Sequence, residues 1–200
     1  MILVTRPAPN FTATAVLGNG KIIENFDFKE FIQNTSTVIF FWPMDFTFVC
    51  PSELIAFHNR YEEFKSRGVK IVGVSIDSVF VHNAWRNTSV KNGGIGPINY
   101  PMISDIKHEI MQAYGIEHPE HGIALRGSFL IDTKGIIRHQ VVNDLPLGRN
   151  VDEMLRMIDA LQFHEECGNV CPAQWEKGQE GIKPSIDGVA KYLSKHATKL

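Results

Sequence analysis

The chain has 200 residues, of which 44% are hydrophobic and 21% charged, and this suits a globular protein with one main domain and a full core. Its 20 basic and 22 acidic residues leave a net charge of −2, so bulk charge indicates neither nucleic acid nor an anionic membrane as a partner. No apolar run approaches the ~18 residues of a membrane span, and the first residues lack the pattern of a signal peptide. We therefore expect a cytoplasmic protein, in which three cysteines are more readily catalytic, metal-binding or incidental than structural disulfides.

The first third of the chain predicts alternating strands and helices. Residues 14–23 predict two short strands about a Gly-Asn-Gly turn, and residues 27–34 carry apolar side chains at helical spacing. The run TVIFFW, residues 37–42, is β-branched and aromatic without polar alternation, which predicts a strand buried on both faces. Residues 51–67 then predict one amphipathic helix that ends at Gly68.

The rest of the chain adds a second buried strand, residues 69–77, and a helix that Asp77 or Ser78 caps. We expect the apolar face of that helix to hold Phe80, Val81, Ala84 and Trp85. A short helix follows, with Ile106, Ile110, Met111 and Tyr114 on one face. Residues 127–132 and 136–142 predict a hairpin, and an amphipathic helix begins at Val151.

Past Gln162 the chain becomes polar, with glycine, proline and isolated aromatics, which predicts an extended arm before a last helix from Ser185. We expect Ile186, Val189, Ala190 and Leu193 on one face of that helix. The whole order predicts an α/β fold with a central mixed sheet flanked by helices. We divide it into a main domain, residues 1–163, and a C-terminal arm and helix, residues 164–200.

Cys50 stands between an apolar loop and Pro51, at the predicted start of a helix. Proline is favoured at the first helical position, which would place Cys50 at the N-cap. There the free N–H groups of the first turn and the positive end of the helix dipole favour thiolate over thiol. The alternative is an inert buried cysteine, and position alone does not decide between the two.

Two neighbours in the loop PMDFTFVCP favour a reactive thiol. Pro43 ends the strand and fixes the start of the loop, and Thr47 can offer a hydroxyl to the thiolate or to a substrate oxygen. The remaining loop residues are mostly apolar, so we expect a partly dry site. Taken alone, Thr47 would be assigned a simple turn hydrogen bond.

The same loop resembles the active-site signature of the peroxiredoxins, Pro-x-x-x-Thr-x-x-Cys. The segments FFW and PSEL on either side also match, and so do VSIDSVFVHNAW, YPMISD, RGSFLID and DLPLGR further along. VCPAQW is similar to the second-cysteine motif of the typical two-cysteine subgroup, which includes bacterial alkyl hydroperoxide reductase peroxidase subunits. The resemblance spans nearly the whole chain and implies a thioredoxin-like fold.

The resemblance implies a thiol peroxidase in which Cys50 attacks a hydroperoxide and becomes sulfenic acid. Arg126 would stand beside the sulfur and donate to the peroxide oxygens, Pro43 would shield the thiolate, and Thr47 would orient the peroxide. Glu53 and Arg149 would hold Arg126 and the first helical turn; as bare sequence, each is an ordinary exposed charge. No metal, haem or other cofactor is implied, because the thiolate itself does the chemistry.

Cys171 matches the resolving cysteine, which in this family condenses with the sulfenic acid of the other chain of a dimer. The resemblance implies a homodimer, a ring of five such dimers, and hydrogen peroxide and alkyl hydroperoxides as substrates. Thioredoxin or a flavoprotein disulfide reductase would then restore both thiols. Cys167 stands where relatives usually have another residue, often histidine; it would compete with Cys171, bridge to it, or be incidental.

A metal site is the sharpest alternative, because His164, Cys167 and Cys171 have a spacing found among zinc ligands. That reading lacks an obvious fourth ligand and leaves Cys50 unexplained. A thioredoxin-type oxidoreductase needs a C-x-x-C pair, and position 53 is glutamate. A papain-like hydrolase lacks its signature around Cys50. A holdase chaperone role, which family members combine with catalysis, is compatible with the sequence.

Overall fold

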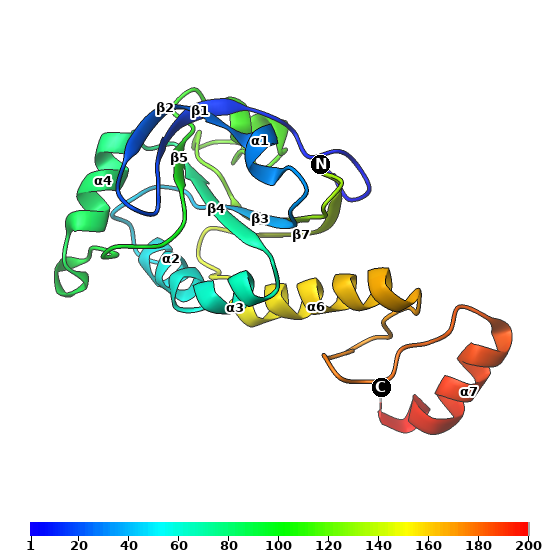
Figure 1. The fold of residues 1–200 in the computed structure, drawn as a ribbon. Coiled ribbons are helices and arrows are strands. Elements are labelled where there is room, and N and C mark those ends of the chain that lie inside the picture. Colours follow the sequence, from blue (N-terminus) through cyan, green and yellow to red (C-terminus); the bar gives the residue numbers. More distant parts are fainter. Residues whose placement is uncertain (200) are drawn as a thin grey trace. The chain divides into compact units, whose positions relative to one another are not determined.

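The computed structural model describes residues 1–199, which form two compact units (Figure 1). The first unit is Met1–Val151 and the second begins at Asp152. The predicted fold class is confirmed, because a mixed sheet with flanking helices fills the first unit and a helix follows the arm in the second. The predicted domain division after residue 163 falls inside a helix, α6 (Val151–Cys167), and stays a prediction.

Within the described residues, seven strands form one sheet in the order β2-β1-β5-β4-β3-β6-β7. β3 lies inside the sheet, parallel to β4 and antiparallel to β6, so both of its edges are hydrogen-bonded. The three-residue strand β5, which sequence patterning did not predict, connects β4 to β1. The strands are β1 (Thr12–Val16), β2 (Ile22–Asp27), β3 (Thr37–Phe41), β4 (Lys70–Ser75), β5 (Met102–Ser104), β6 (Arg126–Ile131) and β7 (Ile137–Asn143).

The single helix predicted for residues 51–67 is wrong, because two helices occupy this stretch. Arg60, between them, has φ −100° and ψ 10°, outside the helical region. As predicted, the chain leaves the helical conformation at Gly68, where φ is +67°. The helices of the first unit are α1 (Phe28–Ile32), α2 (Cys50–Asn59), α3 (Tyr61–Ser66), α4 (Val79–Asn87), the 3-10 turn η1 (Val90–Asn92) and α5 (Glu109–Ala113).

The predicted face of α4 is partly wrong. Ser78 caps the helix as expected and Trp85 is buried, but the side chain of Phe80 is 74% exposed. His82 and Arg86 are buried in its place, and Arg86 donates to the carbonyls of Leu17, Gly18 and Ile98. These polar side chains tolerate burial because each finds hydrogen-bond partners, so apolar periodicity alone did not identify the buried face. Ile106 is likewise exposed.

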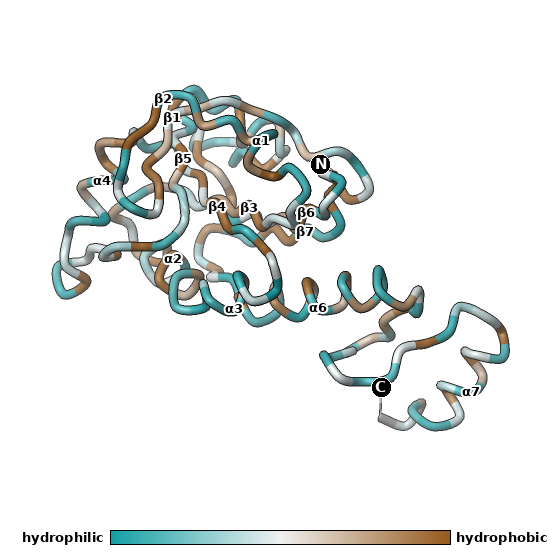
Figure 2. Tube along the Cα trace, viewed as in Figure 1, coloured by the Kyte–Doolittle hydropathy of each residue, from teal (hydrophilic) through white to brown (hydrophobic). Residues whose placement is uncertain are grey.

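Every residue of β3 is buried, and Figure 2 shows hydrophobic residues along the central strands. Ile39 and Phe41 face one core, where Phe41 contacts Tyr114 and Phe129. On the other face, Phe40 stacks on Phe57 of α2 with ring centroids 4.1 Å apart. This aromatic contact fixes α2 against the sheet, so it also fixes the residue at which α2 begins, Cys50.

The second unit contains α6, a connecting arm and two helical segments, α7 (Ile186–His196) and the 3-10 turn η2 (Ala197–Lys199). The arm is more ordered than the sequence predicts. Val170 and Ile182 pair as an isolated β-bridge, and Trp175 is buried with its ring 4.9 Å from that of Phe163. Isolated aromatics in a polar stretch therefore anchor the arm.

The apolar face predicted for α7 exists, but the other described residues, 1–199, do not cover it. Ile186, Val189 and Leu193 are 90%, 42% and 43% exposed, whereas Tyr192 on the same helix is buried. Among residues 1–199, no helix is both long enough and apolar enough to cross a membrane.

Candidate active site

Cys50 is the first residue of α2, where the chain returns from the loop that follows β3. The predicted N-cap position is wrong by one residue, because Val49 is the N-cap and Pro51 is the second helical residue. The carbonyl of Val49 accepts from the N–H groups of Ser52 and Glu53, which makes Val49 the cap. A valine side chain offers no capping hydrogen bond, so the first turn of α2 lacks the stabilisation that a serine or aspartate would give it.

The thiol of Cys50 is fully buried between two hydrogen-bond donors. The hydroxyl of Thr47 lies 2.9 Å from the sulfur, and a guanidinium nitrogen of Arg126 lies 3.3 Å from it. Arg126 carries a permanent positive charge and is itself buried, so water screens it little. Both contacts favour a negatively charged sulfur.

The Thr47 hydroxyl has two possible acceptors. It lies 2.8 Å from the carbonyl of Met44 and 2.9 Å from the sulfur of Cys50, and its single hydrogen can serve only one of them. With a thiol, the S–H can donate to Thr47 while the hydroxyl donates to Met44. With a thiolate, the hydroxyl can rotate and donate to the sulfur.

Arg126, at the start of β6, is held from two sides. Its Nε donates to the carbonyl of Leu145 at 2.6 Å, and the same nitrogen that approaches Cys50 lies 2.6 Å from a carboxylate oxygen of Glu53. Glu53 stands one helical turn after Cys50 and is buried. These contacts leave the guanidinium little freedom, so it is preorganised toward the sulfur.

Arg149 completes the network. Its backbone N–H and its side chain both donate to Glu53, and the guanidinium also donates to the carbonyls of Phe41 and Gly127. The guanidinium carbon lies 5.2 Å from the ring centre of Phe40. Glu53 and Arg149 are therefore buried partners, and the reading of each as an ordinary exposed charge is wrong. Long-range pairing of this kind has no signal in sequence spacing.

The loop between β3 and α2 is only partly dry. Pro43 is buried directly after Trp42, whereas Phe48 is 98% exposed and Phe46 is 51% exposed. Phe46 has φ +54°, an unusual conformation for a non-glycine residue. The structure thus brings Thr47, Glu53, Arg126 and Arg149 around Cys50 and places Pro43 at the base of the same loop.

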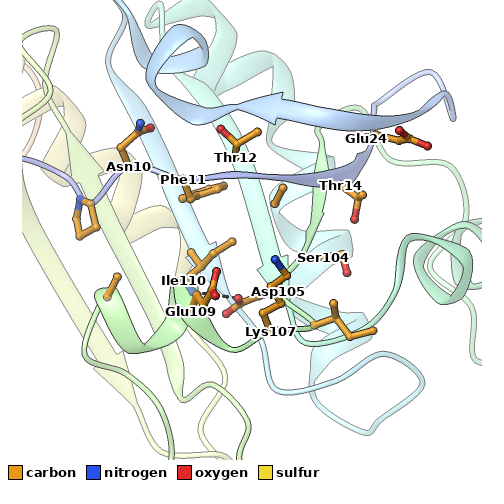
Figure 3. A pocket seen from close by; sticks show the side chains of 14 residues that line it. Asn10, Phe11, Thr12, Thr14, Glu24, Ser104, Asp105, Lys107, Glu109 and Ile110 are labelled. Carbon is orange, nitrogen blue, oxygen red and sulfur yellow. Dashed lines mark hydrogen bonds between the residues drawn. The ribbon is translucent and has the colours of Figure 1, made fainter.

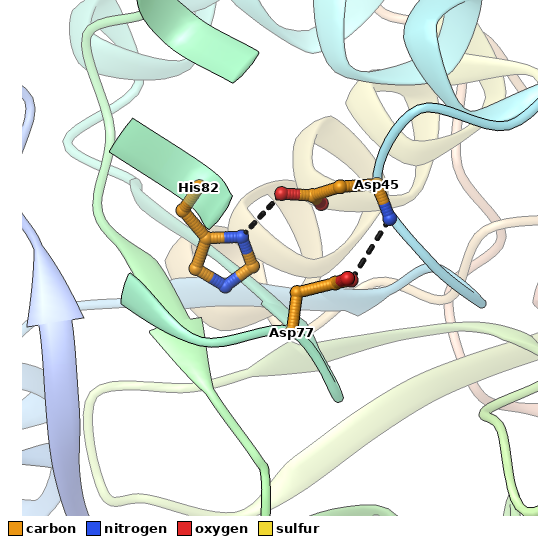
Figure 4. Close-up of side chains that lie close together, drawn as sticks. All are labelled: Asp45, Asp77 and His82. Atoms are coloured by element: carbon orange, nitrogen blue, oxygen red, sulfur yellow. Dashed lines mark hydrogen bonds and ion pairs between the residues drawn. The ribbon is translucent and has the colours of Figure 1, made fainter. Parts of the chain in front are cut away.

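A polar cluster that sequence patterning did not predict, Asp45, Asp77 and His82, fixes this loop (Figure 4). Asp45 accepts from the indole N–H of Trp42 and lies 2.7 Å from Nδ1 of His82, and its own N–H donates to Asp77. Burial is the largest influence on Asp45 and raises the pKa of its carboxyl above the ordinary value. In the sequence, the available signals for this cluster were Asp45 as a lone charge in an apolar loop, and His82 on a helix that also carries the buried Trp85.

The His82 ring shows that this cluster is saturated with hydrogen bonds. Its Nε2 lies 3.2 Å from the carbonyl of Ile103, an obligate acceptor, so Nε2 carries a hydrogen. Nδ1 therefore shares a proton with Asp45, either as an imidazolium beside a carboxylate or as an imidazole beside a carboxylic acid. Either form joins the loop to α4 and β5.

Asp45, Asp77 and His82 form the one group of potential metal ligands that lie close together among residues 1–199. Their ligand atoms already have partners, since Asp77 also accepts from the hydroxyl of Ser75 at 2.7 Å. A cation here would have to displace these hydrogen bonds. The zinc alternative based on His164, Cys167 and Cys171 finds no support, because these three do not form such a group.

A cavity of about 390 Å³ lies elsewhere, between the start of β1 and the segment from Ser104 to Ala113 (Figure 3). Its walls include Phe11, Thr12, Asp105 and Ile110. None of the predicted site residues lines it. We therefore do not identify this cavity with the site at Cys50.

The second unit holds the other two cysteines. Cys171 is half-buried and its thiol donates to the carbonyl of Ala160 at 3.4 Å; Cys167 is exposed and donates to the carbonyl of Phe163 at 3.0 Å. Burial, and then the neighbouring Cys167, raise the pKa of Cys171 above its ordinary value, and the charge of Arg156 opposes this shift.

Comparisons with known proteins agree with this site. Residues 4–140 match the AhpC/TSA family, and residues 160–195 match the C-terminal domain of 1-Cys peroxiredoxin. The chain is 64% identical to alkyl hydroperoxide reductase C of Buchnera aphidicola over 98% of its own length and 100% of that protein. It is 52% identical to alkyl hydroperoxide reductase C of Helicobacter pylori, with full coverage of both chains. The reduced 2-Cys peroxiredoxin of Plasmodium vivax superposes with a TM-score of 0.93 at 44% identity, over 97% of this chain and 100% of that one.

Proposed function

The chain belongs to the AhpC/TSA family, and from this premise we propose that Cys50 is the peroxidatic cysteine of a thiol peroxidase. Its substrates are hydrogen peroxide and alkyl hydroperoxides. The observation that carries the proposal is the buried sulfur with two donors, Thr47 and Arg126, converging on it. A thiolate in this position attacks an oxygen, and the same donors are placed to stabilise the charge that leaves on the other oxygen.

In the first step, the Cys50 thiolate attacks the terminal oxygen of the hydroperoxide, and the O–O bond breaks. The sulfur becomes sulfenic acid, and hydroxide or alkoxide leaves and takes up a proton. Arg126 donates to the oxygens, and the hydroxyl of Thr47 orients the peroxide. Glu53 and Arg149 act as positioning residues, because Glu53 holds Arg126 and Arg149 in turn holds Glu53. Pro43 shields the thiolate from water.

In the second step, Cys171 of another copy of the chain condenses with the sulfenic acid and releases water. Because Cys50 is fully buried in the first turn of α2, this turn must unwind before the two sulfurs meet. The valine N-cap supports the proposal, since it leaves this turn without a side-chain cap. Thioredoxin or a flavoprotein disulfide reductase then restores both thiols.

We propose a homodimer that assembles further into a ring of five dimers in the cytoplasm. The exposed apolar side chains of α7, Ile186 and Val189 among them, support association with another chain. Phe48 and Phe80, which are 98% and 74% exposed, support a second contact between dimers. The solved structures similar to this chain include one described as an artifactual octamer, formed by a Plasmodium yoelii protein modified at its N-terminus.

The test uses a Cys167→Ser chain, so that only Cys50 and Cys171 can react. The reduced protein receives one equivalent of hydrogen peroxide, free thiols are blocked, and a non-reducing gel is run. We expect covalent dimers, and we expect Cys50→Ser or Cys171→Ser in the same background to abolish them. Dimers that persist without Cys50, or no rapid thiol loss at all, would contradict the proposal.

An additional holdase chaperone role is tested separately with the Cys50→Ser variant in an aggregation assay on a heat-labile protein. Protection equal to that given by the parent chain, together with absent peroxidase activity, would support an independent chaperone role. Loss of protection in Cys50→Ser would contradict an independent chaperone role.

A further inference from the structure

We propose that Cys167 is a third catalytic thiol, which takes over the disulfide from Cys50 by attacking Cys171 and so leaves a Cys167–Cys171 disulfide within one chain. The inference rests on the proposed function, because it needs the disulfide between Cys50 and Cys171. Its starting point is that the thiols of Cys167 and Cys171 donate to carbonyls on neighbouring turns of α6.

The geometry of the second unit brings these thiols together. Cys167 donates to the carbonyl of Phe163 and Cys171 to the carbonyl of Ala160, and residues three apart on a helix share one face, about 4.5 Å apart along the axis. Cys167 also contributes to the raised pKa of the Cys171 thiol, which agrees with this placement. An exposed thiol therefore stands beside the residue that carries the intersubunit disulfide.

The segment between Cys167 and Cys171 forms a short reversal of the chain. Gly168 follows α6 with φ +71°, a left-handed conformation that reverses the chain, and space is open around its Cα. After this reversal the arm runs back along α6, because Arg156 donates to the carbonyl of Trp175. Cys171 thus lies against α6 at the carbonyl of Ala160, near the one that Cys167 contacts, and the proposed disulfide requires the arm to shift along the helix.

The exchange is balanced without any added reactant. Cys167 gives its proton to solvent, and its thiolate attacks the Cys171 sulfur. The Cys50–Cys171 bond breaks, and its electron pair leaves on the Cys50 sulfur. One disulfide is broken and one is formed, so Cys50 is reduced as Cys167 is oxidised.

The surroundings of the leaving sulfur give the exchange its direction. Thiol–disulfide exchange is faster when the departing thiolate is stabilised. Once back in its pocket, Cys50 has the hydroxyl of Thr47 and the charge of Arg126 beside it. Cys171 has a carbonyl acceptor instead, which cannot stabilise negative charge. The product disulfide includes the exposed Cys167, where a reductant can reach it.

The first experiment compares the parent chain with Cys167→Ser, without any reductant. Serine can make the same hydrogen bond to Phe163, so we expect the variant to fold normally. After one equivalent of hydrogen peroxide, we expect Cys167→Ser to remain a covalent dimer on a non-reducing gel. The parent chain should pass through the dimer and return to monomers. No lysine or arginine separates Cys167 from Cys171, so one tryptic peptide should carry the new disulfide in mass spectrometry.

The second measurement determines how many equivalents of hydrogen peroxide each chain consumes in the rapid burst. In the parent chain the exchange frees Cys50 for another attack, so the rapid burst of peroxide consumption should be about twofold larger per chain than in Cys167→Ser. The extra equivalent should leave Cys50 as sulfenic acid, which dimedone labels.

Each outcome separates this inference from the proposed function. Dimers of equal lifetime and bursts of equal size in both chains would overturn the third-thiol role and leave the peroxidase intact. Dimers that form in Cys171→Ser and need Cys167 would also overturn it, because Cys167 would then resolve Cys50 directly. Absence of Cys50-dependent dimers in the Cys167→Ser background would instead refute the proposed function.

Discussion

Cys50 and Cys171 are both thiols, but their surroundings are opposite. Cys50 is fully buried and receives hydrogen bonds from Thr47 and Arg126, whereas Cys171 is half-buried and donates its own hydrogen to a backbone carbonyl. Donors aimed at sulfur favour thiolate, and an acceptor favours thiol. Burial alone therefore does not decide reactivity; the direction of the hydrogen bonds does.

This difference gives the two cysteines different tasks. A sulfur surrounded by donors is a good nucleophile toward peroxide and a good leaving group from a disulfide. A sulfur that keeps its proton reacts slowly with peroxide in solution, and it stays reduced until it meets the sulfenic acid of Cys50. Substitutions can remove the donors at Cys50 one at a time. A substitution of Arg156 changes the charge near Cys171 and leaves the surroundings of Cys50 as they are.

The largest effect should come from Arg126→Met, because it removes the charged donor beside Cys50. We expect the second-order rate constant with hydrogen peroxide to fall by about 10²- to 10³-fold, measured by stopped-flow. Glu53 keeps its bonds to Arg149, so the fold should survive. Arg138→Met is the control, since Arg138 makes a partly exposed ion pair with Asp132. An unchanged rate in Arg126→Met would show that this guanidinium does not act on the sulfur.

The next largest effect should come from Thr47→Val, which keeps the shape of the side chain and removes the hydroxyl. We expect a rate loss of about 10²-fold, because one uncharged donor to the sulfur disappears. Thr47→Ser keeps the hydroxyl and should stay close to the parent rate. Equal losses in valine and serine variants would mean that the methyl group, and not the hydrogen bond, is what matters.

Much of this site could be predicted from the local sequence. The strand at 37–42, the apolar loop and Pro51 were enough to place Cys50 at a helix start beside Thr47, with an error of one residue at the cap. The error arose because Val49, with no side chain suited to capping, still takes the N-cap position. Family resemblance, and not patterning, supplied Arg126, Glu53 and Arg149.

What local sequence could not supply was pairing across long separations. Arg149 contacts Glu53, 96 positions earlier, and Asp45 contacts His82, 37 positions later. Such pairs form because the sheet order brings distant segments together, and nothing in helical or strand periodicity encodes them. The same limit explains the wrong face of α4, where His82 and Arg86 are buried by partners outside the helix.

A smaller effect should follow when the start of α2 is capped. Val49→Ser adds a side-chain cap, which stabilises a helix start by about 1 kcal/mol. Unwinding of the first turn should slow by about fivefold, and dimer formation after peroxide should slow equally. Sulfenic acid formation, measured in the Cys171→Ser background, should keep its rate. A change in that first rate would show that the substitution disturbs the pocket and not the unwinding.

The smallest effect concerns the charge beside Cys171. Arg156 lowers the pKa of this thiol, against the larger effect of burial, so Arg156→Met should raise the pKa further. At neutral pH less thiolate is then present, and alkylation of Cys171 by iodoacetamide should slow by about threefold.

Arg156→Lys keeps the charge and should react like the parent. Cys167→Ser removes a neighbour that raises the same pKa, so it should change the rate in the opposite direction. Because the difference depends on the thiolate fraction, the rates of parent and variants should converge as the pH rises past the pKa of Cys171, and a difference that persists there would be steric.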